Sequence, residues 1–187
     1  TASVLGVERY LVEDALVQAV QEKYIIRQQI AGETFLYLPE LYEAETYIAG
    51  RVTLMLQDIP LEIESYDMQI NLLEEELDIE YAELQRRAIA MALQNRIFIL
   101  TGGPGTGKTT ALNGILSLLE TQGESVALAA PTGRAAMRMS EVCEREAKTI
   151  HRLLEVDYRV DDSDTITFKR NEKNLLRHDT VILDEVS

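Results

Sequence analysis

The residues best suited to chemistry lie between Gly102 and Thr109, which fit the spacing G-x-x-x-x-G-K-[ST]. Glycines at these places let backbone N–H groups point at phosphate oxygens without a side chain in the way. The apolar run that begins at Ile97 predicts a buried strand, and a helix is predicted to begin at Lys108, where its N-terminus adds unpaired donors. A chance glycine-rich turn is the alternative, and the flanking strand and helix argue against it. The sequence therefore predicts a loop that binds a nucleotide.

The expected contacts of this loop follow from its residue types. The Lys108 ammonium would reach the β- and γ-phosphates, and the Thr109 hydroxyl would ligate Mg²⁺. ATP and Mg²⁺ are therefore the expected cofactors. The other loop and helix residues expected to contact the nucleotide are Gly103, Pro104, Gly105, Thr106, Gly107 and Thr110.

Two adjacent carboxylates, Asp184 and Glu185, follow the apolar run Val181–Leu183. A strand that ends in acids is common, but together with a phosphate-binding loop it indicates a site for a metal ion and water. We expect Asp184 to hold Mg²⁺ and Glu185 to orient and deprotonate the attacking water, with Lys108 as the third catalytic residue. Because water activation would waste the nucleotide in a small-molecule kinase, hydrolysis coupled to movement is the favoured interpretation.

Three further polar features each admit a structural and a functional interpretation. Residues Thr132–Arg134 begin a predicted helix, which is a good place to hold an anion, but the threonine could equally cap its own helix. Residues Thr149–Leu154 form a short amphipathic turn that contains a His-Arg pair, and a histidine in such a turn is often structural. The Gln85 amide could read adenine through one donor and one acceptor, or be an ordinary polar helix residue.

The elements that must position these residues alternate from Tyr81 onward between strands and helices, which predicts an α/β fold with a parallel sheet. Ligands of such sheets bind at the carboxyl ends of the strands, where each polar segment falls. The predicted strands are Ile97–Thr101, Ser125–Ala130 and Thr180–Leu183, and the predicted helices are Ala82–Gln94, Lys108–Glu120 and one that begins at Arg134.

The chain before this point is mostly helical, and we place a domain boundary near Asp78, which separates domains 1–78 and 79–187. Periodic apolar residues predict helices over Glu8–Glu22, Glu40–Gln57 and Glu62–Leu77, with a β-hairpin formed by Tyr24–Ile30 and Thr34–Leu38. A helix followed by a hairpin is similar to half of a winged helix, which often touches DNA. A small scaffolding domain is the alternative, since no basic or aromatic cluster marks the hairpin.

The composition restricts the class of protein. The formal net charge is −14, from 18 Lys and Arg against 32 Asp and Glu, so bulk electrostatics oppose DNA binding and leave only a local basic groove. No apolar run approaches the roughly 20 residues that cross a bilayer, and a secretory signal is absent, so we expect a cytoplasmic location and no membrane contact. A single cysteine excludes an intrachain disulfide and a Cys-rich zinc site.

Taken together, the motifs resemble those of RecD-type DNA helicases, the 5′-to-3′ branch of superfamily 1. The matching segments come in the family's order: GGPGTGKTT at Gly102–Thr110, APTGRAAMRMSE at Ala130–Glu141, TIHRLLE at Thr149–Glu155 and VILDEVS at Val181–Ser187. YAELQRRAI at Tyr81–Ile89 is similar to the family's glutamine motif. LPELYEAE at Leu38–Glu45 resembles the N-terminal extension of the long RecD-like form, an exodeoxyribonuclease V alpha-like protein that works without RecB and RecC.

This resemblance implies a function for each segment. Residues 79–187 would form the first RecA-like domain, and Gln85 would contact adenine. Two motifs would lie along single-stranded DNA, with contacts from Thr132, Gly133 and Arg134 and from Thr149, His151 and Arg152. The protein would step along one strand and separate the duplex at junctions, driven by ATP hydrolysis, in DNA repair and recombination.

The sequence departs from the family at two places. Val186 stands where the family usually has alanine after Asp-Glu, and the chain stops at Ser187, so we expect the N-terminal portion of a larger helicase. The second RecA-like domain, which carries the arginine finger, would be its partner, and this chain alone would bind ATP but scarcely hydrolyse it. The alternatives are a nucleotide-binding module without motor activity and another P-loop ATPase, such as a ring-forming type, against which TIHRLL and Gln85 argue.

Overall fold

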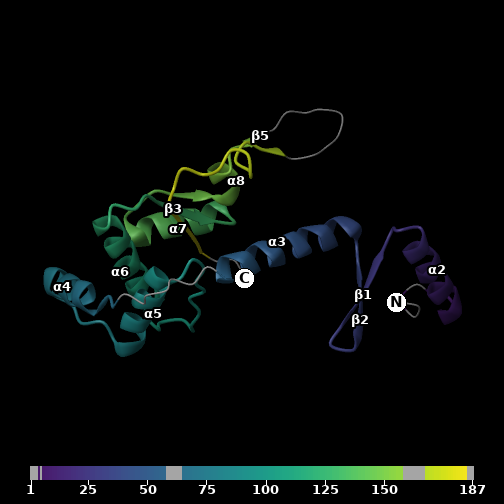
Figure 1. The fold of residues 1–187 in the computed structure, drawn as a ribbon, viewed down its shortest axis with the longest axis horizontal. Helices are drawn as coiled ribbons and strands as arrows, with labels where there is room; N and C mark the ends of the chain where they lie inside the picture. Colours follow the sequence, from purple (N-terminus) through teal and green to yellow (C-terminus); the bar gives the residue numbers. More distant parts are fainter. Residues whose placement is uncertain (1–3, 5, 58–64, 158–166, 185–187) are drawn as a thin grey trace. The chain divides into compact units, whose positions relative to one another are not determined.

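A computed structural model describes residues 4, 6–57, 65–157 and 167–184 (Figure 1). The chain divides into two compact units, Thr1–Ile59 and Pro60–Ser187. Among the described residues, no helix combines the length and the apolar character that crossing a membrane requires.

The first unit contains a helix, a hairpin and a second helix, as the sequence predicts. Its elements are α2 (Arg9–Gln21), β1 (Ile26–Ile30), β2 (Glu33–Tyr37) and α3 (Pro39–Gln57). The two strands pair antiparallel, with Ile26 opposite Tyr37 and Ile30 opposite Glu33. Neither α2 nor α3 buries a residue, and Ile48 of α3 is 60% exposed. Among the described residues, the buried apolar core therefore lies in the second unit.

The second unit begins earlier than the boundary near Asp78 that the sequence suggests. Helix α4 (Asp67–Leu77) buries Ile70 and Leu73 in the same cluster as Tyr81 and Ile115. Its apolar face is therefore part of the core of this unit, and the structure divides the chain between Ile59 and Pro60 instead. The predicted start of this helix, Glu62, lies outside the described residues.

The remaining elements of the second unit confirm the α/β fold with a parallel sheet. The helices are α5 (Glu83–Gln94), α6 (Lys108–Thr121), α7 (Gly133–Cys143) and α8 (Ile150–Leu153). The sheet has the strand order β4 (Ala147–Thr149), β3 (Val126–Ala130), β7 (Thr180–Leu183), and both pairings are parallel. A small antiparallel pair, β5 (Val156–Asp157) and β6 (Thr167–Phe168), follows α8. The sequence did not predict β4, β5 or β6.

The predicted strand Ile97–Thr101 is wrong, because the structure has no strand in this segment. Leu100 packs against the core cluster that Ile182 of β7 also contacts, whereas Ile99 is 78% exposed. An apolar run becomes a strand only when a neighbouring segment exchanges backbone hydrogen bonds with it. Within the described part of the chain, β7 pairs with β3 alone, so this segment has no ladder partner.

Candidate nucleotide-binding site

The loop before α6 contains two glycines in a left-handed backbone conformation. Gly105 and Gly107 have φ of +74° and +78°, a left-handed region that side chains other than glycine rarely adopt. Gly107 is the N-cap of α6, and a Cβ at Gly102 would lie 2.8 Å from the Thr106 hydroxyl oxygen. The glycine-rich loop therefore leads directly into the N-terminus of a 14-residue helix, where backbone N–H groups suit an anion.

Lys108 lies over this loop. Its Nζ donates to the backbone carbonyls of Gly102 and Gly103, both at 2.7 Å, and the Thr106 hydroxyl donates to the Gly103 carbonyl at 2.9 Å. An ammonium has three N–H donors, so one remains for a phosphate oxygen. The predicted residues Thr109 and Thr110 occupy the first turn of α6, and both are exposed. Glycine backbone, a helix N-terminus and a free ammonium donor together fit a triphosphate.

Gln85 is brought to the same loop although it lies 22 residues earlier in the sequence. Its Nε2 donates to the Gly107 carbonyl at 3.3 Å, and its Oε1 accepts from the Ala82 backbone N–H at 2.9 Å. The sequence indicated Gln85 as a candidate because its amide has both a donor and an acceptor. Nothing in the sequence identified Gly107 as its hydrogen-bond partner.

The carboxyl end of β7 delivers one of the two predicted acids. The Asp184 backbone N–H donates to the Ala129 carbonyl of β3 at 3.0 Å, which extends the β3–β7 pairing to the start of the predicted metal site. Asp184 is exposed. Glu185, the predicted water-activating residue, lies outside the described residues.

The residues predicted to contact DNA lie at or just after the carboxyl ends of two paired strands, β3 and β4. Ala130 of β3 is opposite Thr149 of β4 in the parallel register, and each strand leads into a helix, α7 or α8. The hydroxyl oxygens of Thr132 and Thr149 each accept from a backbone N–H at 3.2 Å, which makes both threonines N-caps of their own helices. The capping interpretation of Thr132 is therefore confirmed.

Capping leaves the other polar groups of the two helix starts accessible. Gly133, Arg134, His151 and Arg152 are all exposed. The imidazole of His151 also contacts Phe168 of β6, with ring centroids 6.0 Å apart. The residues of these two helix starts are called the strand-end surface below: Thr132, Gly133, Arg134, Thr149, His151 and Arg152.

A pair of residues that the sequence did not single out supports the helix that carries Gln85. Glu74 of α4 accepts from the Tyr81 backbone N–H at 2.7 Å and pairs with the Arg86 guanidinium of α5. The Tyr81 hydrogen bond and Arg86 lower the pKa of Glu74. The two charged residues are 12 positions apart, so no local pattern could have identified the pair.

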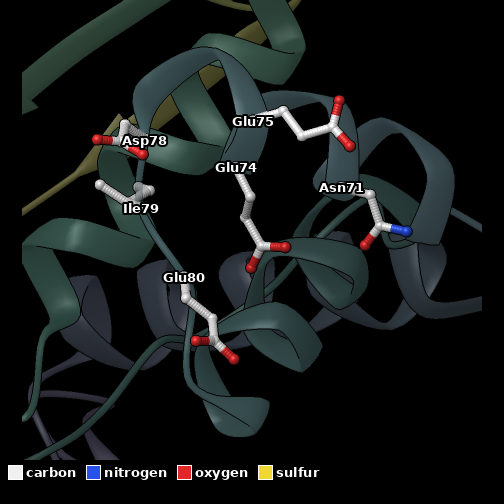
Figure 2. Close-up of a pocket in the computed structure, with 6 residues that line it drawn as sticks. All are labelled: Asn71, Glu74, Glu75, Asp78, Ile79 and Glu80. Carbon is white, nitrogen blue, oxygen red and sulfur yellow. The ribbon is translucent and has the colours of Figure 1, made fainter.

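An acidic surface pocket beside this pair is not the nucleotide site. It is lined by Asn71, Glu74, Glu75, Asp78, Ile79 and Glu80 (Figure 2). Carboxylates repel phosphate oxygens, and none of the residues predicted to bind ATP lines the pocket. The Glu74 carboxylate is already engaged by Tyr81 and Arg86.

A second carboxylate joins two strands of the sheet at their amino ends and predicts a pH dependence of stability. Asp179 accepts hydrogen bonds from the Ser125 hydroxyl at 2.6 Å and the Ser125 backbone N–H at 2.9 Å, and these bonds lower the pKa of Asp179. A lowered folded-state pKa stabilises the protein above the unfolded value, about 3.9, and this stabilisation disappears as the pH falls through the folded pKa. Asp179→Asn is therefore expected to lower the free energy of unfolding at neutral pH. The free energy of unfolding of this variant should also fall less than that of the wild type as the pH is lowered.

Urea unfolding at neutral and acidic pH measures this effect, and Asp14→Asn on the exposed face of α2 is the matched control. An unchanged acid dependence in Asp179→Asn would show that the bonds to Ser125 contribute no linkage.

The amino-acid sequence is similar to those of known proteins. A family model described as an AAA domain matches residues 85–187. The ATP-dependent RecD2 DNA helicase of Deinococcus radiodurans is 34% identical over an alignment that covers 83% of this chain and 21% of that protein. The RecBCD enzyme subunit RecD of Mycobacterium tuberculosis is 37% identical, with 55% of this chain and 21% of that protein covered.

A third relative extends over more of the chain than the family model does. The RecBCD enzyme subunit RecD of Buchnera aphidicola subsp. Schizaphis graminum is 32% identical and covers 81% of this chain, which is 27% of that protein. The chain thus spans between a fifth and a third of the length of these curated relatives. On its parallel sheet, its P-loop and these matches, the chain belongs to the AAA-domain family and is of the RecD type.

Proposed function

We propose that this chain is the nucleotide-binding part of an ATP-dependent DNA helicase that moves 5′ to 3′. The observation that carries the proposal is the P-loop geometry, with Lys108 over the loop carbonyls at the N-terminus of α6. Lys108 would hold the β- and γ-phosphates, Thr109 and Asp184 would hold Mg²⁺, and Glu185 would accept a proton from water. Gln85 would contact adenine. Bound Mg-ATP would supply the phosphoryl group whose transfer to water provides the free energy for movement.

Single-stranded DNA and its junctions with duplex are the proposed partners. The strand-end surface contains the helix starts that follow two paired strands and the exposed side chains of Arg134 and Arg152, which suit phosphate oxygens. The relative from D. radiodurans is named as an ATP-dependent DNA helicase, which supports the same class of substrate. A role in DNA repair and recombination would follow from this activity.

A second RecA-like domain of the same protein is the proposed partner for hydrolysis. The chain covers 21% of the D. radiodurans relative, so most of that protein's length has no counterpart here. We propose that an arginine from this further domain completes the site, because transition-state charge on the phosphates needs cations from more than one side.

The test is an ATPase assay on the full-length protein, with and without single-stranded DNA. We expect hydrolysis to rise when DNA is added. ATP binding with no stimulation by DNA would favour a nucleotide-binding module without motor activity.

The strand-end surface makes a separate prediction about salt. Arg134→Ala and Arg152→Ala should each weaken DNA binding across all sequences and lower the slope of log affinity against log salt by about 1. Fluorescence anisotropy with a labelled oligonucleotide at several salt concentrations measures this slope. Arg87→Ala, an exposed arginine of α5 outside this surface, is the control, and equal slopes in all variants would place the DNA elsewhere.

A further inference from the structure

Helices α5 and α6 pack along one line of residues. Gln85 and Ile89, four residues apart on α5, face Gly107, the N-cap of α6, and Gly114 within α6. Ile89 is fully buried, and a Cβ at Gly114 would lie 2.7 Å from its Cδ1. Because this contact fixes α5 against α6, the backbone of Gln85 is held at a set distance from the P-loop.

The Gly107 carbonyl receives two hydrogen bonds. One comes from the Ala111 backbone N–H at 3.0 Å and starts α6, and the other comes from Gln85 Nε2 at 3.3 Å. The fit around Gly107 is close, since a Cβ there would lie 2.1 Å from the same Nε2. Gln85 thus contacts the residue that sets the direction of the first turn of α6.

We propose that Gln85 is a positioning residue for phosphate binding, which acts through the Gly107 carbonyl whichever base the nucleotide carries. This inference rests on the proposed function of the P-loop as a triphosphate site. By holding Gly107, the amide sets the orientation of the following residues, Lys108 and Thr109, and of the N–H groups of the first turn.

The same amide retains the capacity to contact a base. A glutamine amide has two N–H donors and two acceptor lone pairs. Gly107 uses one donor and the Ala82 backbone N–H uses one lone pair, so one of each remains. Gln85 therefore links the adenine contact proposed above to the geometry of the phosphate loop, and its loss affects both.

The decisive ligand is one without a base. Isothermal titration calorimetry on the full-length protein compares Mg²⁺-tripolyphosphate, Mg-ATP and Mg-UTP binding in the wild type and Gln85→Ala. Loss of one net hydrogen bond that orders the loop is expected to weaken tripolyphosphate binding about three- to tenfold. UTP binding should weaken by the same factor, and ATP binding by at least that much.

Gln122→Ala is the matched control, because it makes the same substitution at the exposed C-cap of α6 and should leave all three affinities unchanged. Gln85→Met keeps the length and packing of the side chain without its donor, and it replaces Gln85→Ala if thermal unfolding shows that the alanine variant is unfolded. It should weaken tripolyphosphate binding by a similar factor.

Unchanged tripolyphosphate and UTP affinity in both Gln85 variants, with loss of ATP affinity alone, would overturn the inference and leave Gln85 as a base contact only. A wild-type protein that binds neither tripolyphosphate nor ATP would instead refute the proposed function. The two failures are therefore distinguishable by the wild-type titrations.

Discussion

Lys108→Ala is expected to abolish DNA-stimulated ATP hydrolysis in the full-length protein, with a loss of about 10²–10³-fold or more. The Lys108 ammonium lies 2.7 Å from two carbonyls of the loop, and its remaining donor is the one cation of the P-loop available to the phosphates. No neighbouring side chain of the loop can replace it, since the other residues between Gly102 and Thr109 are glycine, proline and threonine. Steady-state hydrolysis with saturating single-stranded DNA measures the loss.

The fold should survive this substitution. Gly102 and Gly103 are exposed, so water can hydrate their carbonyls once the ammonium is removed. Circular dichroism and thermal unfolding should therefore match the wild type. Lys173→Ala removes an exposed lysine from the same unit and is the control, expected to keep full activity. Full activity in Lys108→Ala as well would remove Lys108 from the site.

Glu185→Gln is expected to bind Mg-ATP normally and to hydrolyse it about 10²–10⁴-fold more slowly. An amide has nearly the shape of a carboxylate but cannot accept a proton from water, so the chemical step is lost and nucleotide binding is kept. Single-turnover hydrolysis and equilibrium nucleotide binding, measured separately on the full-length protein, distinguish the two effects.

Asp184→Asn is the informative contrast, because it should impair metal binding, whereas Glu185→Gln should impair the chemical step. The Asp184 backbone N–H donates to the Ala129 carbonyl of β3, so the substitution leaves the strand pairing in place and removes one of the two proposed metal ligands. Nucleotide binding should then lose most of its dependence on Mg²⁺. Normal turnover in Glu185→Gln would assign water activation to another residue, and unchanged Mg²⁺ dependence in Asp184→Asn would place the metal elsewhere.

Several features of this protein were predictable from the sequence because a few neighbouring residues determine them. The start of α6 at Lys108 follows from a glycine loop, and β7 spans Thr180–Leu183 as its apolar run predicts. The hairpin of the first unit follows from two β-prone runs around Gly32. In each case the pattern lies within one short stretch of the chain, and the backbone hydrogen bonds or turn conformations that it favours are local.

Other features depend on partners far away in the chain, and only the tertiary structure decides them. Helix α4 belongs to the second unit because Ile70 and Leu73 pack in a core cluster with residues from Tyr81 onward. The Ile97–Thr101 run forms no strand because it has no ladder partner among the described residues. The contact between Gln85 and Gly107 joins residues 22 positions apart. The sequence by itself determined which residues are chemically able to hold a nucleotide. Packing determined how they are oriented, because that depends on which distant side chains fill the space between two helices.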